Sequence, residues 1–114
     1  MKSLTVQLQP DLAPGLDIPL TRSAIEAVAK TDIVVSHSFS AGEDGGPYLN
    51  FTFCTFNPRA LWLQLSQSLY PDNAWGENLK NSTIVACEGS RGWDNYLLLH
   101  HFDRSVALDD PGDL

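Results

Sequence analysis

Three polar side chains at the end of the apolar segment YLLLHHFDRS could do chemistry: His100, His101 and Asp103. An imidazole titrates near neutral pH, and a carboxylate two residues away could orient it as a general base or a metal ligand. Successive side chains of a strand point to opposite faces, so His101 and Asp103 share one face and His100 lies on the other. The same spacing fits the polar end of a strand. We predict such a strand end, with His100 partly packed and the other two exposed or at an interface.

A third histidine, His37, lies in the apolar segment 33–39, where a core histidine bonded to the backbone is the expected role. It is a weak candidate for catalysis beside His101 and Asp103. A metal site built from His37, Cys54, Cys87 and one of the histidines of the last strand would need the fold to bring them together, and the chain has neither a CxxC nor an HxxxH pattern. The sequence therefore predicts no metal and no cofactor.

The segment ACEGSRGWDN is the most distinctive loop, because Glu88, Arg91, Trp93 and Asp94 lie close together around two glycines. Trp and Arg are enriched at binding hot spots, and loops on a rigid sheet commonly carry sites. These four residues are the predicted binding residues. The sequence equally allows a hairpin whose Trp93 folds back on the core and whose Arg91 pairs with Glu88.

Charge limits the classes of partner. The 114 residues include 7 Lys and Arg against 14 Asp and Glu, a formal net charge of -7, with no basic cluster. Binding to nucleic acids or anionic membranes depends on such clusters, so neither is expected. A basic protein is electrostatically compatible. The start of the chain lacks the apolar stretch of a secretory signal, and two cysteines without such a signal predict reduced thiols and a cytoplasmic protein.

Residue patterns predict seven elements. The alternation in KSLTVQLQP indicates a strand that ends at Pro10, and the breakers of DLAPGLDIPL indicate a loop. Ser23 and Glu26 have the spacing of a capping box, which predicts a helix over residues 23–30. Segments 32–40 and 47–56 are rich in β-branched and aromatic residues and flank the turn-like AGEDGG, which predicts a hairpin.

The second half begins with the clearest helix, in NPRALWLQLSQSLYP, where Asn57 can cap, Pro58 suits the first turn and Pro71 follows the end. A loop over DNAWGENLKN and strands over 82–89 and 95–102 complete the prediction.

This order predicts an α+β fold: a ferredoxin-like βαββαβ unit with an additional C-terminal strand, its antiparallel sheet bearing two helices on one face. Residues 1–108 would form a single domain, and the acidic segment 109–114 would fray. The sheet face away from the helices would carry Val34, Tyr48, Cys54 and part of the apolar last strand. A partner or second copy would then cover it.

Two functional hypotheses follow. The first is a small acidic protein-binding module without catalytic activity, of the inhibitor, immunity or antitoxin kind, that covers a basic surface of a partner protein. The alternative is a homodimeric α+β barrel that binds a small ligand or performs simple acid-base chemistry through His101 with Asp103, or through His37. The sequence marks no catalytic set, so an enzyme is the weaker hypothesis.

Overall fold

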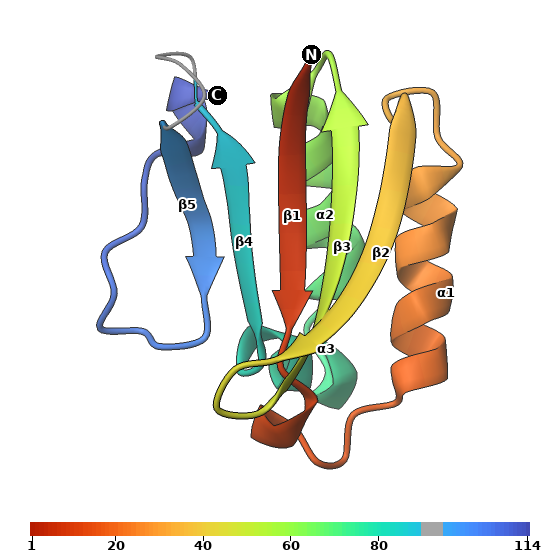
Figure 1. The fold of residues 1–114 in the computed structure, drawn as a ribbon, viewed down its shortest axis with the longest axis vertical. Coiled ribbons are helices and arrows are strands. Elements are labelled where there is room, and N and C mark those ends of the chain that lie inside the picture. Colours follow the sequence, from red (N-terminus) through yellow and green to blue (C-terminus); the bar gives the residue numbers. More distant parts are fainter. Residues whose placement is uncertain (90–94) are drawn as a thin grey trace.

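One antiparallel sheet organises the chain, with the strand order β2-β3-β1-β4-β5 (Figure 1). The structure is a computed structural model that describes residues 1–89 and 95–114. The strands are β1 (Lys2–Leu8), β2 (Ser36–Glu43), β3 (Pro47–Thr55), β4 (Thr83–Glu88) and β5 (Tyr96–His101). The described helices are α1 (Ile18–Ala29), α2 (Pro58–Leu69) and α3 (Ala74–Lys80), with 3-10 turns η1 (Pro10–Leu12) and η2 (Pro111–Asp113). The α+β class and the hairpin pairing of β2 with β3 are thus confirmed.

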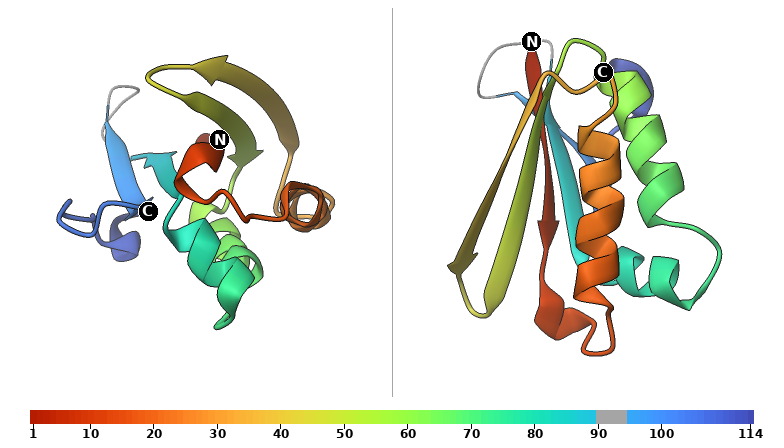
Figure 2. Two further views of the ribbon diagram at one scale, coloured as in Figure 1. Left: turned by 90° about the horizontal axis from the view of Figure 1, so that it is seen from below. Right: turned by 90° about the vertical axis from the view of Figure 1, so that its right-hand side faces the viewer.

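The helices lie on one face of the sheet, where the core forms (Figure 2). Leu4, Val6 and Leu8 of β1 face the helices. The residues of β3 and β4 that pair with them lie on the same face. The buried apolar core includes Leu4, Val6, Leu8, Ile25, Val28, Phe51, Phe53, Leu61, Leu65, Leu69, Leu79, Val85, Cys87 and Leu99. None of the helices in the described ranges has the length and apolar character needed to cross a membrane.

The other face of the sheet is polar at its centre. Thr5 pairs with Thr52 and Gln7 with Asn50 across β1 and β3, and the two threonine hydroxyls lie 3.0 Å apart. This face is less apolar than expected, because segment 33–35, which was to supply Val34, precedes β2, although Tyr48 and Cys54 lie on it as predicted. Serines of β2 take those places beside β3.

Helix α1 begins five residues earlier than the capping-box prediction. Asp17 is its N-cap and accepts a hydrogen bond from the Leu20 amide, 3.0 Å away. Pro19 lies in the first turn, where the missing amide hydrogen costs nothing, so the proline that suggested a loop starts the helix instead. In α2 the predicted Asn57 cap and Pro58 are confirmed.

The sequence did not predict α3. Asn73 caps it by accepting from the Gly76 amide, 2.8 Å away. The backbone of Pro71 passes so close to Gly76 that a Cβ there would overlap it, so glycine allows this helix to follow α2 directly. Trp75 donates from Nε1 to the Thr21 hydroxyl at 3.1 Å, which fastens α3 to α1.

A bulge in β5 changes the predicted faces of the last strand. Leu97 pairs with Cys87, Leu98 with Ala86 and His100 with Val85, so Leu99 is an extra residue. An extra residue shifts the alternation by one position. His100 therefore lies on the helix-facing side together with Leu97, whereas simple alternation puts these two residues on opposite faces.

The two edges of the sheet differ. The segment after β5 returns along it: the Asp109 amide donates to the Leu98 carbonyl at 2.9 Å, and the Asp109 carboxylate accepts from the Leu98 amide at 2.7 Å. Residue Arg59 of α2 donates to the Gly112 carbonyl in η2. At the opposite edge, seven of the eight residues of β2 are exposed. The β5 edge is covered at Leu98, whereas β2 is exposed along its length.

Candidate functional site

Of the predicted binding loop, Arg91, Trp93 and Asp94 lie outside the described residues. Glu88 ends β4, and its carboxylate accepts from the Ser3 hydroxyl at 2.6 Å and the Ser3 amide at 2.9 Å. These two hydrogen bonds, the hydroxyl first, lower the pKa of Glu88. The carboxylate therefore fastens β4 to the start of β1.

The Asp103 carboxylate does not orient the His101 imidazole. Nδ1 of His101 accepts from the backbone amide of Asp103 at 2.9 Å. The Asp103 carboxylate instead accepts from the hydroxyl and the amide of Ser105, at 2.7 and 3.0 Å, and these bonds lower its pKa. The two residues form a local turn in which the carboxylate does not hold the ring.

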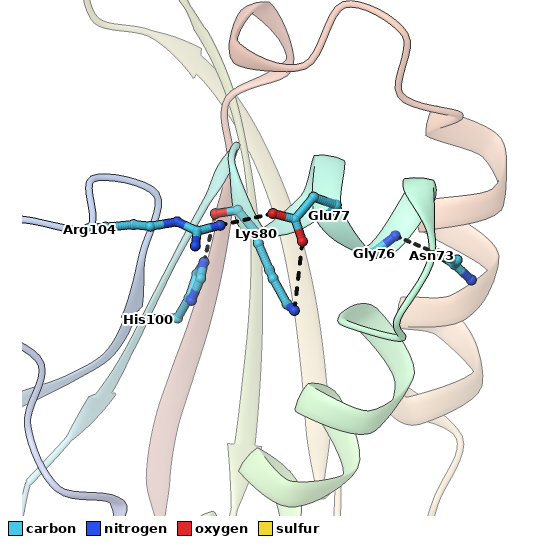
Figure 3. A network of polar contacts seen from close by, with 6 residues as sticks. All are labelled: Asn73, Gly76, Glu77, Lys80, His100 and Arg104. Carbon is cyan, nitrogen blue, oxygen red and sulfur yellow. Dashed lines mark hydrogen bonds and ion pairs between the residues drawn. The ribbon is translucent and has the colours of Figure 1, made fainter.

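His100 is a packing residue between β5 and α3 (Figure 3). Its Nε2 donates to the Lys80 carbonyl at 2.9 Å, and its ring centroid lies 4.7 Å from that of Tyr70. Burial lowers the pKa of His100. Glu77 completes this network: its carboxylate contacts Arg104 at 2.9 Å and Lys80 at 3.9 Å. A shallow pocket of about 310 Å³ adjoins these residues, but the charged groups of Glu77, Lys80 and Arg104 that line it are paired with one another.

The remaining predicted residues are dispersed. His37 is exposed, not in the core as expected, because β2 is an edge strand; it pairs with Phe53 and lines a groove between β2 and α1. Cys54 pairs with Ser36 on the polar face, whereas Cys87 pairs with Leu4 on the helix face, so the sheet separates the two thiols. Within residues 1–89 and 95–114, no three His, Cys, Asp or Glu side chains gather closely enough to hold a metal ion.

A narrow groove of about 140 Å³ separates α1 from β2 and β3. Its floor is apolar, formed by Ile25 and Phe53 among others. Arg22 closes its rim by placing its guanidinium 4.5 Å from the centroid of Phe39, whose ring lies 5.2 Å from that of Phe51. The one cation at the rim is thus already engaged with an aromatic face.

A second pocket lies on the polar face, at the end of the β2–β3 hairpin. It measures about 210 Å³ and is lined by Gln7, Gln9, Asp44, Gly46, Tyr48 and Asn50. The tip of the hairpin leans away from the helices (Figure 2). Nε2 of Gln9 donates to Oε1 of Gln7 at 3.2 Å. Side-chain amides, a phenol and a carboxylate thus converge in one polar pocket.

Sequence reasoning missed this pocket. Its signal was present, since Gln7 and Asn50 are amide side chains at outward positions of two strands, but only the β1–β3 register shows that they are neighbours. Tyr48 lies across Gly42 of β2, whose missing side chain leaves room for the phenol.

Comparison with models of protein families, with curated proteins and with solved structures found no match. The candidate sites must therefore be weighed on their geometry alone.

Proposed function

We propose that this chain is a non-catalytic binding module that recognises a basic protein, and that the partner adds an extended segment along β2. The open β2 edge is the observation that carries this proposal. An edge strand presents unpaired amide and carbonyl groups that can bind another strand, the mode called β-augmentation.

The register supports a specific set of contacts. At the hairpin tip the Asp44 amide donates to the Gly46 carbonyl at 3.0 Å. Hydrogen-bonded and non-hydrogen-bonded pairs alternate along an antiparallel ladder, so Phe39 and Ala41 direct their backbone groups away from β3. Natural edge strands are usually protected by Lys, Pro or a covering segment. β2 contains neither Lys nor Pro.

Charge favours a basic partner over a second copy of the chain. The formal net charge is -7, and Glu43 at the end of β2 and Asp44 directly after it are adjacent exposed carboxylates. Two copies paired through β2 would add like charges, whereas a basic segment would be attracted and would associate faster.

We also propose that β1–β4 with α1 and α2 form a ferredoxin-like unit to which β5 is added. The strand order β2-β3-β1-β4 supports this proposal, as do the helical connections between β1 and β2 and between β3 and β4. In such a unit β2 is an edge strand, the position that strand addition requires.

The test uses two variants at one position. Ala41→Pro removes an outward amide, whereas Ala41→Thr keeps it and suits a strand. Each protein is immobilised, exposed to native lysate and eluted with salt, after circular dichroism has shown equal folding. We expect a basic protein bound by wild type and Ala41→Thr and lost with Ala41→Pro. Equal capture by all three, or capture of no basic protein, would refute the proposal. A dimer in sedimentation that only Ala41→Pro dissociates would assign the edge to a second copy.

A further inference from the structure

We propose that the polar pocket at the end of the β2–β3 hairpin receives a cationic hydrogen-bond donor, the ammonium of a lysine or the guanidinium of an arginine side chain. This inference rests on the proposed function, because it assigns to the basic partner a side chain that enters beside the end of β2. It adds a defined recognition site to an edge that would otherwise accept any extended backbone.

A buried acceptor without a partner is the first observation. Oδ1 of Asn50 lies out of contact with solvent and has no hydrogen-bond partner among the residues that the structure describes. Buried polar atoms in folded proteins are almost always paired, and those that are not call for an explanation. Asn50 lines the pocket, so a rotation of its side-chain amide would bring this oxygen to a donor bound there and supply the missing hydrogen bond.

The charge of the pocket is the second observation. Asp44 lines it, and a Cβ placed on Gly46 would lie 3.7 Å from Oδ2 of Asp11, which brings a second carboxylate to its rim. None of the lining residues is Lys or Arg, and in the described part of the chain both ion pairs involve Glu77 at the distant α3. Carboxylates without a cation favour a positively charged group over a neutral one.

The remaining walls suit such a group. Tyr48 contributes an aromatic ring, and aromatic rings attract cations. The amide oxygens of Gln7 and Gln9 are further acceptors beside it. Pockets for drug-sized molecules hold roughly 300–1,000 Å³, so a volume of about 210 Å³ fits the end of a side chain better than a nucleotide or an oligosaccharide.

The free chain tests the inference without the partner. ¹⁵N-labelled protein is titrated with Nα-acetyl-lysine methylamide and with its arginine counterpart while the side-chain amide signals of Asn50, Gln7 and Gln9 are followed by NMR. The matched neutral probe carries an acetyl group on the lysine Nε, and methyl glucoside tests for a sugar. We expect saturable shifts of these signals with a millimolar Kd for the cationic probes alone.

Two variants of equal charge locate the site. Asp44→Asn should weaken binding of the cationic probes about fivefold, as expected for the loss of one partly exposed ion pair. Asp32→Asn removes the same charge from the α1–β2 loop at the opposite end of β2 and should leave the Kd unchanged (Figure 1). Equal weakening by both variants, saturation by the neutral probe or the sugar, or shifts that never saturate would overturn the inference.

The two proposals fail separately. If Ala41→Pro loses the partner but no cationic probe binds, the proposal of strand addition at β2 stands and the pocket proposal is rejected. If the cationic probes bind but the partner binds Ala41→Pro as well as wild type, the pocket proposal stands and the proposal of strand addition at β2 is rejected.

Discussion

A short chain of hydroxyl groups joins α2, α3 and β4, and it gives a prediction of measurable size. Thr83 is buried, and its hydroxyl donates to the Leu79 carbonyl at 2.6 Å. A hydroxyl has one hydrogen. The 2.7 Å contact between the Tyr70 and Thr83 hydroxyls must therefore be donated by Tyr70. The Leu79 carbonyl can only accept, and this fixes the direction of both hydrogen bonds.

Removing each member has a different cost. Tyr70→Phe deletes one donated bond and should lower the free energy of unfolding by about 1 kcal/mol. Thr83→Val keeps the shape but deletes both bonds and also strands the Tyr70 hydroxyl, which should cost about 3 kcal/mol. In the double variant no hydroxyl is stranded, so we expect a cost of about 2 kcal/mol where additivity requires about 4 kcal/mol.

Urea unfolding monitored by fluorescence measures these values, since Trp62 lies edge-on to Tyr70 with ring centroids 6.5 Å apart. Burial raises the pKa of Tyr70 in the folded chain. The stabilisation is therefore complete below about pH 10, where the unfolded phenol titrates, and is lost as pH rises further. Tyr70→Phe should remove that part of the alkaline loss. Additive costs, or an unchanged pH slope in Tyr70→Phe, would refute the reasoning.

Three further outcomes are expected. Burial raises the pKa of the Cys87 thiol to about 11, so a thiol reagent at neutral pH should modify the partly exposed Cys54 and reach Cys87 only on unfolding; equal rates in the folded protein would contradict this. Because the pKa of His100 is lowered, its stabilisation is complete above about pH 6.5 and is lost as pH falls. Urea titrations at two pH values should show this loss in wild type and not in His100→Gln. Asp17→Ala should cost about 1 kcal/mol and Ser23→Ala close to nothing, and the reverse order would restore the capping-box prediction.

Elements whose signals are local were predictable. α2 carries its cap, its first-turn proline and its apolar face within one segment, and β1 alternates without interruption. α3 has only seven residues, of which Gly76 and Leu79 are buried, too few to show a helical period. Its position depends on the close approach of Pro71, which no pattern in the segment reveals.

Features that depend on pairing were not predictable. The bulge at Leu99 exists because β5 must match β4, and it moved His100 to the face opposite the one that simple alternation gave it. The polar pocket likewise requires the β1–β3 register and the lean of the hairpin. Candidate residues chosen for their chemistry, such as His101 and Asp103, proved to bond mainly within their own turn.

The central place of β1 has a consequence for biosynthesis. Leu4 pairs with both Phe53 and Cys87, so β1, which leaves the ribosome before β4, must wait for it before its second edge is closed. Contacts between residues far apart in sequence slow folding, because a long loop must close before they form. A nascent chain ending before β4 would expose an apolar strand edge at its centre, and chaperones would be expected to bind there until residues 83–88 emerge.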